Sequence, residues 1–350
     1  MRKIPGDKAH GRVKTVNTLR HLISRAFRKL FPELMSKRDE KLIVRSLHEE
    51  HCRQLKAMET KVNFTQQQWV DFIIQRYKQI TGHDLDLENP RRYTEKMQWR
   101  KLFEDDPRMT ALSDKYEVRE WVKKTIGEEY LIPLIGVWER PEDIDFEKLP
   151  DSFVLKTNNA CETNIIVRDK KQLNQSVVRE TLDYWLKIPF WSFSGEMHYK
   201  NIKPRIIAEK YITVEGTHDL PDYKFLCFDG KVYCSYYIKD RVKGHKETQL
   251  GIFDRDFNLL PYYRTELLPM KTVQPKPFHY EQMVELAEQL SSGFSHVRVD
   301  LYDVNGKIYF GEMTFTNGSG FFVHEPDCFD YILGEQWKIG PNHIDNHGLC

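Results

Sequence analysis

The stretch VRVDLYDVNGKIYFGEMTFTNGSGF, residues 297–321, decides the fold class of this chain. Runs rich in β-branched and aromatic residues flank Asn305-Gly306, and an Asn-Gly pair favours the positive φ angles of a tight hairpin turn. Side chains two positions apart share one face of a strand, so Arg298 and Asp300 lie on the same face. The hairpin brings Glu312 alongside them.

Asp300 and Glu312 are candidate metal ligands because two neighbouring carboxylates repel each other unless a cation lies between them. Mg²⁺ sites usually take one or two protein carboxylates and complete their shell with the phosphates of a nucleotide. Arg298 beside them suits negative charge that develops during a reaction. The alternative is a surface carboxylate pair that is bound by Arg298 and has no catalytic role.

Further strands and helices extend the pattern towards the N-terminus. A second hairpin turns at Asp229-Gly230. Since the strands follow one another in hairpins and not in a regular βαβ alternation, the sequence predicts an α+β fold with antiparallel sheets. Other β-rich runs are expected at 153–156, 164–167 and 205–212, and helices at 66–81, 93–104, 114–126, 171–187 and 279–292.

Composition excludes several classes of protein. The 350 residues are 40% hydrophobic, enough for a sizeable core and too much for a wholly disordered chain. Lys and Arg number 53 against 52 Asp and Glu, a balance that argues against a nucleic-acid partner. No run approaches the roughly 18 apolar residues of a membrane span. The six cysteines form no C-x-x-C pair, and no His/Cys spacing suggests zinc, so we expect reduced thiols, polar buried histidines (His198, His245, His296, His324) and a cytoplasmic location.

The N-terminal arm is locally basic. Residues 1–35 hold nine Lys or Arg against Asp7 and Glu33, and apolar residues recur at helical spacing within 16–31. A basic amphipathic helix of this kind either packs on its own domain, the commoner outcome, or lies peripherally on the inner, anionic face of a membrane. Arginines interrupt its apolar face, which argues against a signal peptide.

Two lysines have suggestive settings. Lys115 opens a helical segment, and Lys156 ends the apolar strand 153–156. A lysine so placed can neutralise a phosphate as a point charge, although a single lysine is more often structural or solvated. The polar loop 157–164 follows Lys156; it either covers a phosphate with its backbone N–H groups or is an ordinary hairpin loop.

Taken in order, these residues resemble the ATP-grasp superfamily of carboxylate–amine ligases. The matching positions are Asp114-Lys115, Lys156, Glu209–Ile212, Arg298-x-Asp300 and Glu312-x-Thr314. Within the superfamily the chain is similar to the TupA-like group, which is named for teichuronopeptide biosynthesis. The strings that carry this closer resemblance, over roughly 70–335, are TEKMQW (94–99), SDKYEVREWV (113–122), IGEEYLIPLIGVW (126–138), PDYKFLCFDGK (221–231) and the opening stretch 297–321.

The resemblance implies an ATP-grasp fold in which antiparallel sheets form a nucleotide cleft behind a helical N-terminal region. It divides the chain into a basic arm and linker (1–65), a helical N-terminal part (66–150), a central subdomain that covers the nucleotide (151–212) and a C-terminal subdomain with the metal site (213–350).

The resemblance also implies a role for each matched residue. Lys115 and Lys156 would contact the ATP phosphates, and Asp300, Glu312 and Thr314 would bind Mg²⁺. Arg298 would stabilise an acyl-phosphate and a tetrahedral intermediate, and Arg241 would hold a substrate carboxylate. The remaining nucleotide contacts would come from the hinge Glu209, Lys210, Tyr211 and Ile212, and from Asp222 and Lys224 near the ribose or phosphates.

The chain departs from the family pattern in two places. The loop 157–164 contains no glycine, although glycine eases close approach of backbone to phosphate. Thr314 stands where relatives commonly have Asn, and a hydroxyl, or the nearby Asn317, would have to take that place.

The implied activity is ATP- and Mg²⁺-dependent, ADP-forming amide synthesis, joining an amino acid or other small amine to a uronic acid of a cell-surface polysaccharide. Two alternatives stay open. The triplet Asp254-Arg255-Asp256 is typical of a metal-dependent glycosyltransferase, but D-x-D also occurs at 84–86 and 143–145. A non-catalytic nucleotide-binding protein is the other alternative. ATP binding distinguishes the ligase from the transferase, which would bind a nucleotide sugar.

Overall fold

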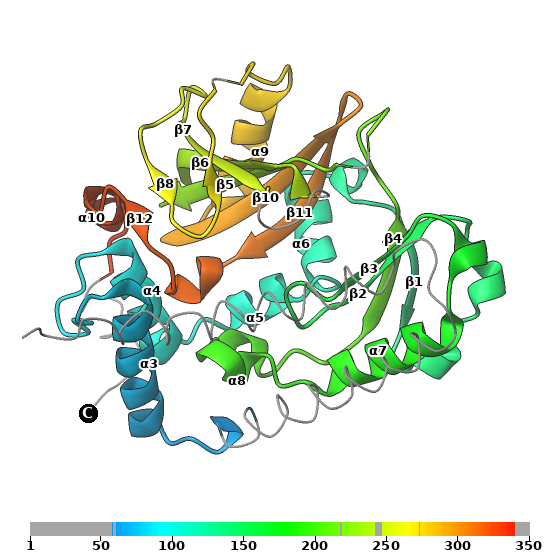
Figure 1. Cartoon of the computed structure of the whole chain (residues 1–350), viewed down its shortest axis with the longest axis horizontal. Coiled ribbons are helices and arrows are strands. Elements are labelled where there is room, and N and C mark those ends of the chain that lie inside the picture. Colours follow the sequence, from blue (N-terminus) through cyan, green and yellow to red (C-terminus); the bar gives the residue numbers. More distant parts are fainter. Residues whose placement is uncertain (1–57, 59–60, 218, 242–246, 273, 340–350) are drawn as a thin grey trace, which may run out of the picture.

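The computed structural model describes residues 58, 61–217, 219–241, 247–272 and 274–339. The predicted basic helix within 16–31, most of the segment 1–65 and His245 lie outside these residues. Two sheets organise the described part (Figure 1). The first is antiparallel, in the order β1-β4-β2-β3, with β1 (Leu134–Trp138), β2 (Phe153–Thr157), β3 (Asn164–Val167) and β4 (Ile206–Lys210).

The second sheet has six strands in the order β11-β10-β5-β6-β7-β9, and only the β7–β9 pair is parallel. Both predicted hairpins form, with positive φ at Asp229-Gly230 and at Asn305-Gly306, as the turn chemistry requires. The predicted α+β class is therefore confirmed. The strands are β5 (Asp222–Phe228), β6 (Lys231–Lys239), β7 (Gln249–Asp254), β9 (Leu268–Pro269), β10 (His296–Val304) and β11 (Lys307–Thr314); a separate ladder joins β8 (Tyr263–Arg264) to β12 (His324–Glu325).

The helices follow their local signals closely. Helix α3 (Gln66–Thr81) has the predicted bounds because Thr65 caps its start and Gly82 ends it in the left-handed conformation. Helix α6 (Val118–Thr125) begins later than predicted because the Asp114 carboxylate accepts hydrogen bonds from the N–H groups of Tyr116 and Glu117 and holds a turn there. The others are α4 (Tyr93–Phe103), α5 (Pro107–Ser113), α7 (Gln175–Lys187), α8 (Trp191–Ser194), α9 (Tyr280–Ser291) and α10 (Cys328–Gln336), with short 3₁₀ turns η1 (Glu128–Tyr130), η2 (Pro141–Asp143), η3 (Phe146–Lys148), η4 (Lys170–Gln172), η5 (Met197–Tyr199) and η7 (Asn317–Gly320).

Helix α7 covers one face of the four-stranded sheet (Figure 1). Phe153 and Leu155 point to this face and pack with Leu182 and Trp185 of α7. Lys156 alternates with them and points to the opposite face. Strand β1 completes this sheet although it precedes residue 151, so the sheet draws on the segment predicted as helical as well as on 151–212.

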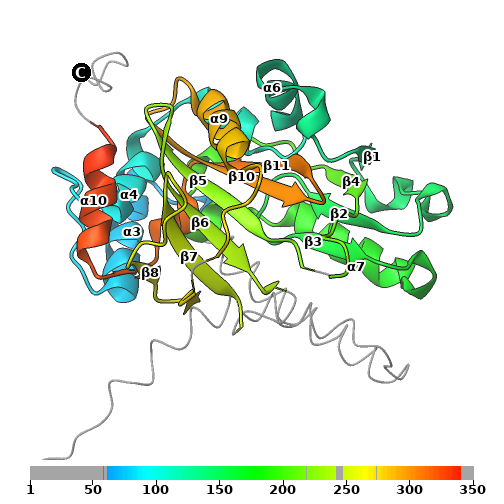
Figure 2. The ribbon, with the colours of Figure 1, turned by 90° about the horizontal axis from the view of Figure 1, so that it is seen from above.

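The six-stranded sheet lies between two helical layers (Figure 2). Helices α9 and α6 pack on one face, against Val297 and Val299 of β10. Helices α4 and α10 pack on the other face, where Leu226 and Tyr236 join Trp337 in a second core. Only part of this second face is apolar; the rest carries the charged residues described below.

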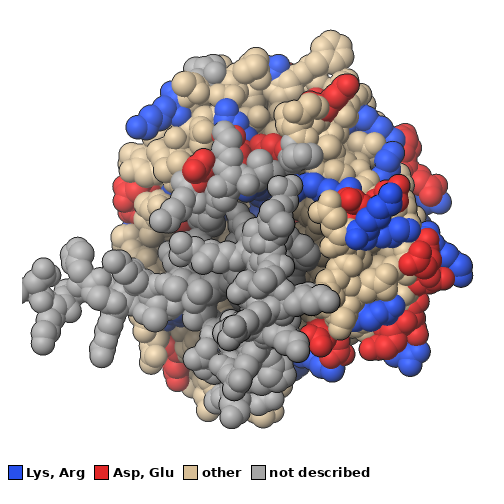
Figure 3. All heavy atoms as spheres, turned by 45° about the vertical axis from the view of Figure 1, so that its right-hand side comes forward, with Lys and Arg blue, Asp and Glu red and all other residues tan. Residues whose placement is uncertain are grey.

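Charge on the surface is mixed. On the face that Figure 3 draws, blue and red side chains are interspersed among tan ones. The chain has exposed ion pairs, which include Lys203–Glu139 and Arg140–Asp143. Such pairs contribute little to stability because water and salt screen them. Within the described residues, no helix combines the length and apolar character needed to cross a bilayer.

Among the described residues, His198, His296 and His324 are buried. His296 shares a hydrogen bond of 2.9 Å with the Tyr93 hydroxyl and lies 2.8 Å from the Cys227 carbonyl oxygen. His198 is buried, and its Nε2 has no hydrogen-bond partner among the described residues. Burial lowers the pKa of His198 to about 4 and the pKa of His296 well below its usual value. Both imidazoles are therefore neutral in the folded protein at neutral pH.

This burial predicts acid-sensitive stability. Unfolded histidine titrates near 6.5, so as pH falls from about 6.5 towards 4 the unfolded chain takes up protons that the folded chain excludes, and the free energy of unfolding falls. His198 alone accounts for up to about 3 kcal/mol at the lower end. When the free energy of unfolding is measured with denaturant between pH 5 and 8, its dependence on pH should be shallower for His198→Gln than for wild type. The half-exposed His83→Gln is the control, and an unchanged slope in His198→Gln contradicts the assignment.

Candidate active site

A row of charged side chains crosses three strands of the six-stranded sheet. Asp300 in β10 lies directly opposite Glu312 in β11 on one side and Lys224 in β5 on the other, which is the arrangement that the hairpin predicted for the two carboxylates. Lys224 Nζ forms an ion pair with Asp300 Oδ2. Because all three alternate with core residues of the α9 face, they share the other face of the sheet.

Arg298 lies on the same face of the sheet, two positions before Asp300 in β10, and binds both carboxylates. Its Nε donates to Asp300 Oδ1 (2.7 Å), and one terminal nitrogen donates to Asp300 Oδ2 (2.8 Å), Glu312 Oε1 (2.5 Å) and Thr314 Oγ1 (2.9 Å). The other terminal nitrogen donates to Asn317 Oδ1 (2.6 Å). Arg298 is only 7% exposed, so it is a buried cation whose donors are used within the site.

The surroundings push the pKa values of the two carboxylates apart. Burial raises the pKa of Asp300, against the opposing effect of Arg298 and Lys224. Burial would also raise the pKa of Glu312, but Arg298, Lys224 and Lys115 together hold that pKa well below its usual range. Glu312 is therefore a carboxylate at any physiological pH.

Asp222 and Arg241 extend the charged row at one end. Arg241 follows β6, and its guanidinium lies 2.5 Å from Asp222 Oδ2. Lys224 Nζ lies 3.9 Å from the same oxygen. Tyr302 stands two positions beyond Asp300 on the same strand. Burial, and then the charge of Asp222, raise the pKa of Tyr302 well above its usual value. The two sequence-predicted arginines thus flank the carboxylate row.

The four-stranded sheet contributes a second charged group. Lys156 Nζ lies 2.7 Å from Glu209 Oε2, and Arg119 donates to Glu209 Oε1 (3.1 Å) and to the Ile132 carbonyl oxygen (3.0 Å). The sequence prediction missed Arg119. Arg119 lies four residues after Lys115, which in the helix predicted over 114–126 would place the two side chains on one side; the observed helix α6 begins only at Val118.

The loop after Lys156 lies against Lys115. The Lys115 side chain donates to the Ala160 carbonyl oxygen, and its backbone N–H donates to the Asn158 carbonyl oxygen (3.2 Å). Burial lowers the pKa of Lys115, while Glu312 opposes this shift, so Lys115 lies close enough to the carboxylate row to interact with it. The loop and Lys115 thereby bring the two sheets into one site.

Asn158 anchors this glycine-free loop. Its side chain donates to Asp114 Oδ2 (2.8 Å) and to the Lys203 carbonyl oxygen (3.0 Å), and accepts from the Arg205 N–H (2.6 Å). Glu162 takes a positive φ of 59°, a conformation usually left to glycine. The sequence prediction treated the absence of glycine as a defect and did not identify Asn158.

The predicted hinge, Glu209–Ile212, consists of the last two residues of β4 and the first two of the connection to the other sheet. Lys210 is exposed, whereas the Tyr211 hydroxyl is buried without a hydrogen-bond partner among the described residues. In the same part of the chain, no backbone acceptor is bonded to the N–H of Ile212. The connection is tied to the tip of the β10–β11 hairpin, since Asn305 binds the Glu215 N–H (2.9 Å) and the Thr213 carbonyl oxygen (3.2 Å).

Glu196 fixes the segment beyond β11. Its carboxylate accepts hydrogen bonds from Ser194 Oγ (2.6 Å), Thr316 Oγ1 (2.5 Å) and Ser319 Oγ (2.8 Å). Thr316 and Ser319 flank Asn317, which binds Arg298. Glu196, which sequence reasoning also missed, is therefore linked to the carboxylates through Asn317 and Arg298.

The donor set suits a hard divalent cation. Asp300 and Glu312 are opposite one another, and the Thr314 hydroxyl lies 3.0 Å from Glu312 Oε1. Oxygen ligands from one or two carboxylates are what Mg²⁺ takes when phosphates complete its shell. Within the described ranges, no point brings together three or more His, Cys, Asp or Glu side chains, so the protein offers a partial shell.

The three D-x-D triplets are used within surface turns. Asp254 accepts from the N–H groups of Asp256 (3.0 Å) and Asn258 (2.8 Å), and its second oxygen accepts from the Asn258 side chain (2.9 Å). Asp86 likewise caps the N–H groups of residues 88 and 89, and Asp143 pairs with Arg140. In this structure Asp254 therefore has a role within its own turn.

Comparison with known proteins adds a family. A model of the TupA-like ATP-grasp family matches residues 95–338. No curated protein sequence matches the chain. Similar solved structures include the D-alanine–D-alanine ligase from Bacillus anthracis complexed with ATP, with 16% identity over 68% of each chain and a TM-score of 0.37. The D-alanine–D-alanine ligase from Helicobacter pylori has 14% identity over 65% of this chain and 61% of its own, with a TM-score of 0.36. A RimK domain ATP-grasp protein from Sphaerobacter thermophilus has 12% identity over 65% of this chain and 69% of its own, with a TM-score of 0.36.

Removing the buried cation should expose the repulsion between the carboxylates. Arg298→Met leaves Asp300 and Glu312 facing each other, and loss of one partner of a buried ionic group typically costs about 3–5 kcal/mol. We expect that loss in denaturant unfolding, and partial recovery in Arg298→Met/Glu312→Gln. Arg140→Met, at a 71% exposed side chain, is the matched control and should leave stability almost unchanged, because water and salt screen an exposed pair. Equal stability of Arg298→Met and Arg140→Met would contradict the described network.

Proposed function

This chain belongs to the TupA-like ATP-grasp family, and from that premise we propose that it is an ATP- and Mg²⁺-dependent carboxylate–amine ligase that forms ADP, phosphate and an amide. One observation carries the proposal: Lys115 is hydrogen-bonded to the loop after Lys156, and its charge helps to lower the pKa of Glu312 in the row that Arg298 holds together. Cations that can bind phosphates thus adjoin carboxylates that can bind a metal, in a partly buried site.

The nucleotide would lie between the two sheets. Lys115 and Lys156 would bind its phosphates, and the hinge Glu209–Ile212 would hold the adenine. The polar edge of the adenine needs backbone groups such as the N–H of Ile212, which is bonded to no backbone acceptor among the described residues. Asp222 and Lys224 would face the ribose or phosphates. Glu209 forms an ion pair with Lys156 and would fix its position, and Arg119 forms an ion pair with Glu209. Arg119 would therefore act as a positioning residue.

Asp300, Glu312 and Thr314 would hold Mg²⁺. When bound, the metal supplies positive charge that neutralises the phosphates and the transferring phosphoryl group. The low pKa of Glu312 suits this role because a metal ligand must be ionised. The fit is incomplete without a nucleotide, as expected of a site whose shell is finished by its substrate.

The reaction then needs positioning more than acid–base chemistry. A substrate carboxylate oxygen attacks the γ-phosphorus, and the bond from phosphorus to the β–γ bridging oxygen breaks, giving an acyl-phosphate and ADP. The nitrogen of the amine attacks the acyl carbon, phosphate departs, and the nitrogen loses a proton to solvent. Arg298 would stabilise the oxygen that becomes negative during the second step, and Arg241 would hold the substrate carboxylate.

For the substrates, we infer an amino acid or other small amine and a uronic acid of a cell-surface polysaccharide. The family's teichuronopeptide connection supports this substrate class. The guanidinium of Arg241, at the edge of the site beside Asp222, is a cation that could bind the carboxylate of a uronic acid. Acidic sugar residues would also be drawn to a site in which Lys115, Lys156 and Lys224 gather.

The ligase proposal predicts loss of nucleotide-dependent behaviour in two variants. Mg-ATP at 100 times its dissociation constant should stabilise wild type by about 2.7 kcal/mol in thermal unfolding. Lys156→Ala should lose most of that stabilisation because a phosphate contact is gone. Glu312→Gln should lose the dependence on Mg²⁺, and both should release ADP at least 100-fold more slowly with amines and uronic acids as substrates. Lys148→Ala, at an 84% exposed side chain, is the control. Full ADP release by both site variants would refute the proposal.

The substrate assignment has a separate test. Mass spectrometry of the surface polysaccharide from cells with and without the protein should show loss of an amide-linked substituent on uronic acid residues. Cells that carry only the Glu312→Gln variant should also lack the substituent, whereas cells that carry only the Lys148→Ala variant should retain it. An unchanged polysaccharide would reject this substrate class and leave the ligase chemistry standing.

A further inference from the structure

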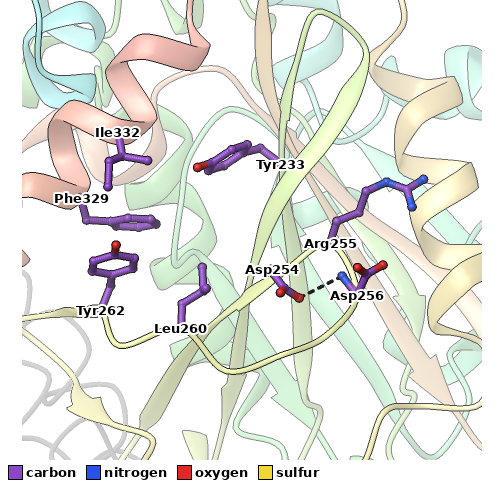
Figure 4. Close-up of a pocket in the computed structure, with 8 residues that line it drawn as sticks. All are labelled: Tyr233, Asp254, Arg255, Asp256, Leu260, Tyr262, Phe329 and Ile332. Atoms are coloured by element: carbon purple, nitrogen blue, oxygen red, sulfur yellow. Dashed lines mark hydrogen bonds between the residues drawn. The ribbon is translucent and has the colours of Figure 1, made fainter.

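A hollow of about 320 Å³ lies on the second face of the six-stranded sheet, away from the charged row (Figure 4). Its walls come from β6, from the turn after β7, from the segment before β8 and from α10. Neither the proposed chemistry nor the nucleotide uses any of these residues. The lining residues are Tyr233, Asp254, Arg255, Asp256, Leu260, Tyr262, Phe329 and Ile332.

Three aromatic side chains, Tyr233, Tyr262 and Phe329, line the hollow. Phe329 is fully buried, and the Tyr262 ring stacks on it with centroids 4.1 Å apart and an interplanar angle of 14°. Tyr233 lies across the hollow from Tyr262 in Figure 4 and is half-buried. Aromatic rings held in this way offer large contact area at little cost in side-chain entropy.

The polar groups around these rings are available to a ligand. Within the described residues, the hydroxyls of Tyr233 and Tyr262 and the carboxylate of Asp256 have no hydrogen-bond partner. Arg255 points away from the rings in Figure 4 and pairs with Glu288 at 3.3 Å. The hollow thus combines apolar ring surfaces with uncommitted hydroxyls and one carboxylate, and it has no uncompensated cation.

This combination matches a sugar ring and not a phosphate or nucleotide. A pyranose has an apolar C–H surface that packs on aromatic rings, and hydroxyls that donate to a carboxylate and exchange hydrogen bonds with phenols. A phosphate would be repelled by Asp256 and would find no free cation. The volume is at the lower end of ordinary ligand pockets, which suits one sugar residue and not a long chain.

The hollow and the active site lie on one row of the sheet. Arg298 in β10 pairs with Leu226 in β5, Leu226 with Cys234 in β6, and Cys234 with Asp254 in β7. Three strand spacings of about 4.8 Å place the backbones of Arg298 and Asp254 about 14 Å apart. An oligosaccharide chain can span this distance, whereas a single monosaccharide cannot.

We propose that the hollow is a second glycan subsite, which binds a hydroxyl-rich pyranose of the same acceptor chain whose uronic acid enters the active site. The identity of the acceptor rests on the proposed function; the preference for a sugar ring rests on the hollow itself. The subsite makes the enzyme favour polymeric over monomeric acceptors, because the second contact adds binding energy that a monosaccharide cannot use.

Binding without ATP tests the subsite directly. Saturation-transfer NMR and titration calorimetry would use two probes, a hexasaccharide of alternating glucuronic acid and N-acetylglucosamine and free glucuronic acid. Tyr233→Leu and Tyr262→Leu should weaken hexasaccharide binding at least fivefold and leave glucuronic acid binding unchanged. Asp256→Asn, on an exposed turn, should weaken it as well without loss of thermal stability. Tyr263→Leu, next to the hollow and not part of it, is the matched control.

The outcomes separate this proposal from the ligase proposal. Wild-type affinity for the hexasaccharide in Asp256→Asn and in both tyrosine variants overturns the subsite, as does equal affinity of the wild type for the two probes. Stabilisation by Mg-ATP, measured on the same samples, reports on the ligase proposal independently. Loss of hexasaccharide binding in the variants, in a protein that Mg-ATP does not stabilise, would keep the subsite and reject the ligase.

Discussion

The buried guanidinium of Arg298 is the interaction on which the rest of the site depends. Taking the Arg298 cation and the Asp300 carboxylate out of water costs several kcal/mol per ion, and that cost is offset only where the geometry is close and the remaining donors are bonded. Arg298 meets this condition through Asp300, Glu312, Thr314 and Asn317. The carboxylates are thus fixed on the rigid β10–β11 hairpin before any metal or nucleotide arrives, so little ordering is left for binding to accomplish.

This requirement extends to elements far along the chain. Asn317 can bind Arg298 only if the segment 316–320 keeps its unusual path, with positive φ at Gly318 and Ser319. Glu196 supplies the hydrogen bonds that hold this path, and it comes from the connection between α7 and β4. The chain segment that leads into the four-stranded sheet therefore also shapes the charged face of the six-stranded sheet. A change at Glu196 would act on Arg298 through this segment without contacting the reacting atoms.

Local signals in the sequence predicted the elements but not the links between them. The Asn305-Gly306 turn and the two-residue strand period were enough to place Arg298, Asp300 and Glu312 together, because each is a matter of neighbouring residues. The pairs Arg119–Glu209 and Thr316–Glu196 join positions 90 and 120 residues apart, and no local period encodes such contacts. Strand β1 was missed for a similar reason: its five residues are all half-buried, so they show no alternation.

The glycine-free loop is the clearest case of a signal with a different physical meaning from the one first given to it. Glycine lets a backbone approach a phosphate closely, but a flexible loop must also lose conformational entropy when the ligand binds. Here Asn158 fixes the loop to Asp114 and Arg205, and Lys115 bonds its far side at Ala160. A loop that is already ordered gives up less entropy on binding, which compensates for the freedom that glycine would have provided. In the proposed ligase its N–H groups would already have to point at the phosphates, so the hydrogen bonds of Asn158, and not the composition of the loop, would set how well it covers a nucleotide.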